Sequence, residues 1–199
     1  MLRVVRRQYL DGERVDLTVV ARELGLSRAT IYRWFGSREA LLGEVIADEL
    51  EQLIDRERGQ ERRRGAAGLL AVFDRINRTL ARSFAVRRFL EQERTGAMRL
   101  LTASSGVVQP RAVACVRELI ETEVAAGTYA PPADPDTLAY AIVRLAEAFL
   151  YNDAANGMRG DHERLRAVEA ALLGVNVASA RYGPRRPVHG RRPGSHSAT

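Results

Sequence analysis

Residues 16–41 read DLTVVARELGLSRATIYRWFGSREAL, and this stretch decides the fold of the N-terminal part of the chain. Its first half places apolar side chains at helical spacing until Gly25 interrupts the pattern. Ser27 can cap a second helix, along which Ile31 and Phe35 lie at positions i and i+4. Glycine tolerates a positive φ, which allows two helices to meet at a steep angle. The stretch therefore predicts a helix-turn-helix.

The second of these helices carries Arg28, Thr30, Tyr32 and Arg33, side chains of the types that reach base edges and phosphates. The local charge agrees, because residues 26–38 contain three arginines and no acidic residue. An alternative stays open for Tyr32, in which its ring packs against the core and its hydroxyl alone reaches a phosphate.

The run T-I-Y-R-W-F, at its offset from A-R-E-L-G and from S-R-E-A-L, resembles the DNA-binding domain of the TetR family of transcriptional repressors over roughly residues 2–55. Three residues depart from the family pattern: Ala29 stands where glycine is common, Trp34 where histidine is common, and Arg38 where lysine is usual. The resemblance makes Arg38 a phosphate anchor, with pairing to an acidic neighbour as the alternative. We expect Trp34 to be partly buried between the recognition helix and the N-terminal helix. The expected DNA contacts are Arg28, Ala29, Thr30, Tyr32, Arg33, Trp34 and Arg38.

Composition favours an all-α protein. The 199 residues are 46% hydrophobic and 6% aromatic. No apolar run approaches the roughly 18 to 20 residues that a membrane span needs, so no membrane partner is expected. Cys115 is the one cysteine and cannot form an internal disulfide, which fits a reducing cytoplasm. We therefore expect a cytoplasmic protein.

The net charge of +6 carries little information about DNA, because it is concentrated at the C-terminus. Residues 181–199 contain five arginines and no acidic residue, and so supply +5 of the total. A recognition surface can still be positive while the domain that carries it is neutral.

The chain divides into a three-helix head and a helical body, about nine helices in all. We expect a DNA-binding domain at 1–58 whose last helix links to the body, an effector-binding and dimerisation domain at 65–181, and a disordered basic tail at 182–199. In the body we expect one helix to end before Gly96, a loop at 102–109, a helix with Pro110 at its first position, and a last helix from about residue 161 to 180.

The body segments R-R-F-L-E-Q-E and V-R-L-A-E-A-F-L-Y-N-D resemble the QsdR-like branch of the same family. This resemblance implies a small amphiphilic effector, a lactone or a similar molecule. The inward faces of the middle helices are the expected pocket, with plain core packing as the alternative for each apolar residue and a structural ion pair as the alternative for Arg144 and Glu147. The expected pocket residues are Phe73, Ile76, Asn77, Phe89, Met98, Val116, Leu119, Ile120, Tyr140, Arg144, Glu147 and Phe149.

The last two helices carry more apolar residues than two helices at a chain end bury alone, which predicts a homodimer, with packing on the body of the same chain as the alternative. The expected interface residues are Leu138, Ile142, Leu145, Leu165, Val168, Leu172 and Val175.

No catalytic constellation, cofactor motif or metal-ligand spacing occurs in the sequence, so we expect no enzyme activity, no cofactor and no metal site. The sequence predicts a ligand-responsive transcriptional regulator that acts as a repressor. We expect it to bind double-stranded operator DNA as a homodimer and to be released by a small apolar effector. The alternative is a DNA-binding regulator or architectural protein with no small-molecule effector.

Overall fold

The computed structural model describes residues 1–151 and 161–175, which form nine α-helices and no strand. This confirms the expected all-α fold. The helices are α1 (Leu2–Leu10), α2 (Leu17–Leu24), α3 (Arg28–Phe35), α4 (Arg38–Gln60), α5 (Gly65–Arg82), α6 (Phe84–Thr102), α7 (Val108–Ala125), α8 (Pro135–Tyr151) and α9 (His162–Leu172). The predicted tail at 182–199 lies outside the described residues, as does the predicted end of the last helix. Among the described helices, none combines the length and the apolar character that a membrane span requires.

Local capping sets the helix boundaries of the head. The side chain of Asp16 accepts a hydrogen bond from the Thr18 amide at 2.7 Å, and thereby caps α2. Ser27 and Ser37 cap α3 and α4 in the same way. Gly25 ends α2 with a φ of 62°, the left-handed conformation that glycine adopts without steric cost. The predicted helix-turn-helix is therefore confirmed.

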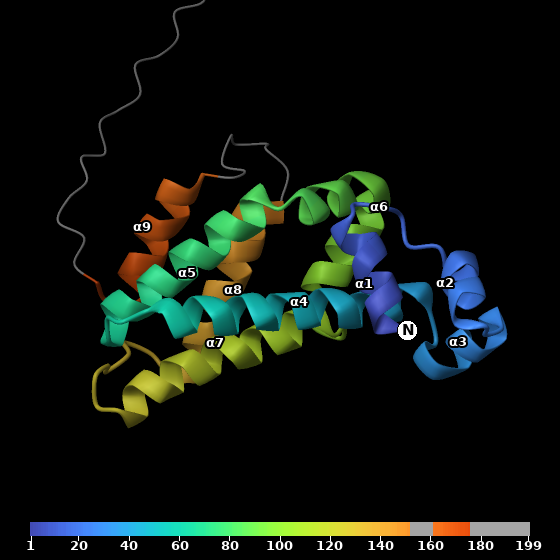
Figure 1. The fold of residues 1–199 in the computed structure, drawn as a ribbon. Helices are drawn as coiled ribbons and strands as arrows, with labels where there is room; N and C mark the ends of the chain where they lie inside the picture. The colour runs from blue at the N-terminus through green and yellow to red at the C-terminus, as the bar shows by residue number, and fades with distance from the viewer. Residues whose placement is uncertain (152–160, 176–199) are drawn as a thin grey trace, which may run out of the picture.

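The single helix α4 belongs to both parts of the molecule (Figure 1). Leu41 and Val45, in its first half, are buried in the core of the head together with residues of α1, α2 and α3. Leu53 and Ile54, in its second half, are buried in the core of the body. The head thus lies at one end of a continuous helix whose other end is packed into the bundle.

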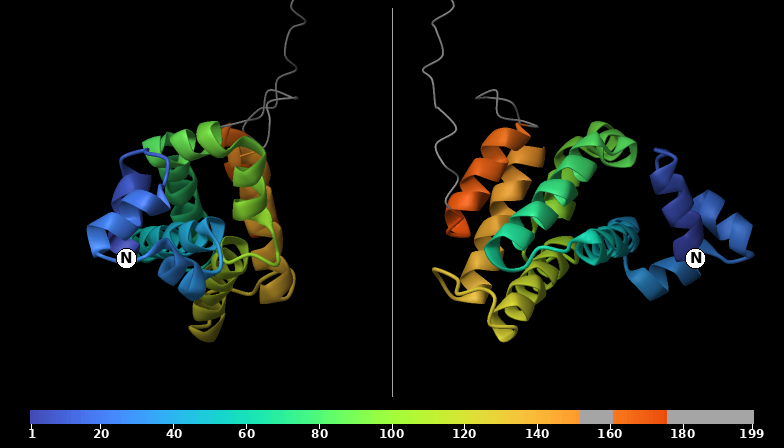
Figure 2. Two further views of the ribbon diagram at one scale, coloured as in Figure 1. Left: turned by 90° about the vertical axis from the view of Figure 1, so that its right-hand side faces the viewer. Right: turned by 60° about the vertical axis from the view of Figure 1, so that its left-hand side comes forward.

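The body is a bundle of α5, α7, α8 and α9 with the second half of α4, which packs against α5 and α7 (Figures 1 and 2). Helix α7 packs against α4 and α8, and α9 packs against α5 and α8. Helix α6 contacts α1 of the head as well as α7 and α8, so it is a second connection between the two parts. A guanidinium at the α4–α7 contact, that of Arg111, pairs with Glu44, Asp48 and Glu51 of α4.

Two details of the body differ from the expectation. Helix α6 continues through Gly96 to Thr102, so the predicted end before this glycine is wrong. An interior glycine costs roughly 1 kcal/mol in a helix, which the packing of α6 on its neighbours outweighs. Helix α7 begins at Val108, two residues before Pro110, which still fits because the first-turn amides have no partner within the helix.

Candidate nucleic-acid interface and effector cavity

Helix α3 presents a basic face to solvent. Its one fully buried side chain is Ile31, which anchors the helix in the core of the head. Arg28, Tyr32 and Arg33 are exposed, and Tyr32 retains 41% of its accessible surface. The guanidinium of Arg28 lies over the Tyr32 ring, 5.9 Å from its centroid. The open alternative for Tyr32, a ring packed against the core, therefore does not describe this structure.

The cationic groups of this face are available to a ligand. Neither Arg28 nor Arg33 has an ion-pair partner within the described part of the chain, whereas most arginines of the body are paired. Ala29 is exposed beside them, and the hydroxyl of the half-buried Thr30 lies 3.0 Å from Ser27 Oγ at the helix start. Such a face suits contacts to phosphates and base edges in the major groove.

Trp34 lies differently from the expectation. The sequence predicts a side chain partly buried between α3 and α1, but 57% of the Trp34 surface is exposed. The core positions of α3 are taken by Ile31 and, in part, by Phe35, so no space remains for the indole. Trp34 therefore adds a large apolar side chain to the exposed surface of the recognition helix.

Arg38 points into the protein. Its Nε donates a hydrogen bond to the Val15 carbonyl at 2.7 Å, and its Nη2 donates to Glu93 Oε1 at 2.6 Å. A third, weaker contact joins Nη1 to Glu39 at 3.6 Å. The hydrogen bond from Arg38 lowers the pKa of Glu93 below its usual range. Arg38 thus ties the start of α4 to the α1–α2 loop and to α6, and the expected role as a phosphate anchor stays a prediction.

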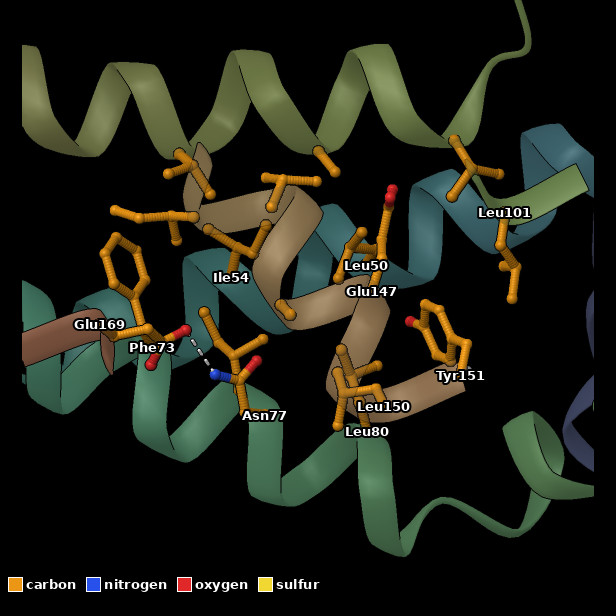
Figure 3. A pocket seen from close by; sticks show the side chains of 17 residues that line it. Leu50, Ile54, Phe73, Asn77, Leu80, Leu101, Glu147, Leu150, Tyr151 and Glu169 are labelled. Carbon is orange, nitrogen blue, oxygen red and sulfur yellow. Dashed lines mark hydrogen bonds between the residues drawn. The ribbon is translucent and has the colours of Figure 1, made fainter. Parts of the chain in front are cut away.

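The body contains an apolar cavity of about 70 Å³ between α4, α5, α7, α8 and α9 (Figure 3). This is several times the space that one water molecule occupies by the same measure. A second cavity of about 150 Å³ lies toward α1 and α6. The two share five lining residues, which form the wall between them: Leu50, Leu80, Leu101, Val108 and Tyr151.

The cavity lining agrees with the predicted pocket in part. Phe73, Ile76, Asn77, Val116 and Glu147 line the first cavity. Phe89 lines the second cavity instead.

Six predicted pocket residues line neither cavity. Leu119 and Ile120 are buried in the core, Tyr140 is half exposed, and Arg144 is exposed. Met98 and Phe149 are partly buried beside the cavities. Helical periodicity identifies an inward face without showing which inward side chains border a void. Contact of these six residues with an effector therefore stays a prediction: Leu119, Ile120, Met98, Tyr140, Arg144 and Phe149.

Two carboxyl groups border the first cavity from opposite sides (Figure 3). Glu147 accepts a hydrogen bond from Arg144 at 2.8 Å, which is the structural ion pair considered from the sequence. Glu169 accepts a hydrogen bond from Asn77 Nδ2 at 2.8 Å. Burial raises the pKa of Glu169 from 4.5 to about 7, and burial also raises the pKa of Glu147 against the opposing effect of Arg144.

The predicted dimer face needs correction. Leu138, Ile142 and Leu165 are only 3%, 2% and 1% exposed within a single chain, so they are core residues and offer no face to a partner. Helices α5 and α7 of the same chain pack against α8 and α9 and bury these residues, whereas the sequence pattern predicts that a second chain buries them. Val168 is exposed, and three further predicted residues are partly buried: Leu145, Leu172 and Val175.

Two functional candidates escape sequence analysis. Glu93 and Glu169 are acidic residues on amphipathic helices, and such residues are assigned to solvent by default. Glu93 is placed by α6 crossing the head, and Glu169 by α9 packing on α5. The one local signal is Asn77, a polar residue within the apolar stripe of α5, because a buried amide requires a partner.

Comparison with known proteins agrees with this geometry. The family model described as "Bacterial regulatory proteins, tetR family" matches residues 13–45, and the model described as "Tetracyclin repressor-like, C-terminal domain" matches residues 64–174. No curated protein matched the chain.

Among the solved structures similar to it are a transcriptional repressor and a transcriptional regulator. The transcriptional repressor QsdR of R. erythropolis is 29% identical, with a TM-score of 0.80 over 87% of this chain and 92% of that one. The regulator PfmR of Thermus thermophilus is 17% identical, with a TM-score of 0.45 over 86% of this chain and 97% of that one. Since the C-terminal model alone spans more than half of the sequence, the chain belongs to the TetR family of DNA-binding transcriptional regulators.

Proposed function

We propose that this protein is a homodimeric repressor that binds operator DNA through α3 and releases it when a small apolar effector, a lactone or a similar amphiphile, enters the body. We further propose that it acts in the cytoplasm and catalyses no reaction. The observation that carries the DNA-binding part is the exposed face of α3, where Arg28 and Arg33 have no ion-pair partner among the described residues. The similarity to QsdR, which is described as a transcriptional repressor, supports repression over activation.

The outward faces of α8 and α9 support the homodimer. Val168 is 42% exposed, and Leu145 is partly buried and belongs to neither apolar core of the chain. A second copy would cover these groups in a four-helix arrangement about a two-fold axis. Sedimentation should give twice the 22.1 kDa chain mass, and Val168→Glu should shift the equilibrium toward the single chain. A single 22.1 kDa species of the native protein at micromolar concentration contradicts the dimer.

The DNA-binding test selects bound duplexes from a random double-stranded library and then footprints the protein on the duplex that binds most tightly. Two protected half-sites whose centres lie about 34 to 36 Å apart are expected, because each α3 of a dimer enters one major groove. Arg33→Ala should weaken binding by about 1 to 3 kcal/mol. Arg62→Ala is the matched control, since Arg62 is also exposed but lies after the far end of α4.

A second arm of this test concerns the tail. Deleting residues 183–199 should leave operator selectivity intact, because a basic tail adds salt-sensitive attraction without base readout. If the deletion abolishes selectivity while Arg33→Ala has no effect, α3 is not the reading element.

The second candidate function is a DNA-binding regulator without an effector, favoured by the small size of the first cavity, about 70 Å³. A thermal-shift screen of small neutral amphiphiles, followed by operator release, separates the two. An effector must weaken operator affinity by the ratio of its affinities for the free and DNA-bound conformations. Stabilisation without operator release would support the second candidate.

A further inference from the structure

Glu169 is a buried residue that lines the first cavity, and one of its two carboxyl oxygens accepts no hydrogen bond from the described residues (Figure 3). The side chain is fully buried, at 0% exposure. Its Oε1 accepts the hydrogen bond from Asn77, while its Oε2 is buried and has no hydrogen-bond partner within residues 1–151 and 161–175. A buried acceptor without a partner costs free energy. Oε2 has no accessible surface in the structure, so a rotation of the Glu169 carboxyl group toward the cavity would let an occupant donate a hydrogen bond to it and be stabilised.

The charges around the cavity favour the same kind of occupant. Its described lining includes two carboxyl groups and no arginine, lysine or histidine. Glu147 is paired with Arg144 at 2.8 Å, which leaves Glu169 as the acceptor in surplus. Asp74 and Arg166 are the charged groups whose fields act on Glu169, and they pair with each other at 3.9 Å.

We propose that the effector carries a hydrogen-bond-donating head group, an amine or an alcohol, which binds Glu169 Oε2 while its apolar chain lies along the cavity toward Tyr151. This assignment rests on the ligand-responsive function proposed above. Of the effectors named there, it favours an amphiphile that carries a donor group over a simple lactone, which offers acceptors alone. The chain is accommodated by the apolar walls of the first cavity and by the adjoining cavity of about 150 Å³ beyond Tyr151.

The same geometry disfavours other head groups. A carboxylate would meet Glu169 with no cation in the described lining to balance the two negative charges. An ether offers acceptors alone and leaves Oε2 of the ionised group without a partner.

The experiment compares four probes that share one alkyl chain: octylamine, n-octanol, methyl octyl ether and octanoate. Binding to the native protein is measured by calorimetry at about pH 8, above the pKa of Glu169 of about 7, so that the carboxyl is mostly ionised. Octylamine is protonated at this pH and would form a charge-assisted hydrogen bond with the carboxylate, so it should bind roughly ten- to hundredfold more tightly than the ether. The alcohol should lie between them, and octanoate should bind weakest.

The variant Glu169→Gln keeps the size of the side chain and its acceptor for Asn77 but removes the charge. It should reduce the preference for octylamine over the ether to within about threefold, since a neutral amide bonds less strongly than a carboxylate. Glu163→Gln is the matched control on the same helix, because the Glu163 side chain is 85% exposed. The control should retain the preference of the native protein.

The outcomes are distinguishable. Equal binding of octylamine and the ether by the native protein overturns this proposal while leaving an effector cavity in place, whether or not the variant folds. A preference that persists in folded Glu169→Gln also overturns it. Failure of every probe to bind overturns this inference, whereas the effector-binding function is decided by the thermal-shift screen and the DNA-binding function by the operator test.

Discussion

Replacing Glu169 by glutamine should stabilise the protein above neutral pH. The folded state holds the Glu169 carboxyl fully buried, with a pKa raised from 4.5 to about 7. A group whose pKa is higher in the folded state binds its proton more tightly there. The stability that this group contributes is therefore fully present below about pH 4.5, and it is lost as pH rises through about 7. A difference of about 2.5 pKa units corresponds to about 3 kcal/mol of destabilisation once the group is ionised in both states.

Glu169→Gln removes this penalty and keeps an acceptor for Asn77. At about pH 8 the variant should be more stable than the native protein by up to about 3 kcal/mol, and the difference should shrink toward zero near pH 4. Urea denaturation of both proteins across this range, followed by circular dichroism, measures the difference at each pH. Glu163→Gln, on the exposed side of the same helix, should show no such trend. A stability difference that does not change with pH, or a variant that is less stable at pH 8, would refute the reasoning.

Three further outcomes follow from the structure. Gly65→Ala should lower the free energy of unfolding by about 2 to 4 kcal/mol in denaturation experiments, because Gly65 has a φ of 65° and a Cβ there would overlap the Thr128 carbonyl oxygen. Gly25→Ala, where φ is also positive but the space is open, should cost about 1 kcal/mol. Equal costs for the two variants would contradict the overlap. Trp34 is the one tryptophan of the sequence and lies exposed on α3, so its fluorescence should change when operator DNA binds, and unchanged emission at saturation would place it away from the interface. Burial raises the pKa of the Cys115 thiol to about 11. Iodoacetamide should therefore modify Cys115 far more slowly than a free peptide thiol at neutral pH, and the rate should increase as pH rises. A modification rate equal to that of the peptide would show that the thiolate is not disfavoured.

Features that depend on neighbouring residues in the chain can be predicted from the sequence. Asp16, Ser27 and Ser37 cap helices through hydrogen bonds to amides two or three residues away, and each cap is evident from residue type and position. The same holds for Gly25, whose positive φ closes the turn. These local interactions determine the helix-turn-helix, which is why the sequence predicts this unit in detail.

Features that depend on which helices meet in space cannot be predicted in this way. The sequence pattern assigns the apolar surplus of Leu138, Ile142 and Leu165 to a second chain, whereas helices of the same chain bury these residues. Trp34 resembles a core residue because it is large and apolar. In the structure, however, Ile31 is the one fully buried residue of α3, and Trp34 is exposed. Glu169 resembles a surface residue because it is charged. In each case residue type indicates the usual environment, and tertiary packing decides otherwise.

The continuity of α4 has a mechanical consequence. Its 23 residues extend for about 34 Å as a single stiff rod, with the head attached at one end and Leu50 and Ile54 bordering the cavity near the other. Ile54 lies about 24 Å from Arg38 at 1.5 Å per residue, so a tilt of about 5° about Ile54 displaces the head end of α4 by about 2 Å. In the dimeric, effector-responsive repressor proposed above, a side-chain rearrangement too small to disturb the bundle would thereby become a mismatch of groove spacing between the two heads.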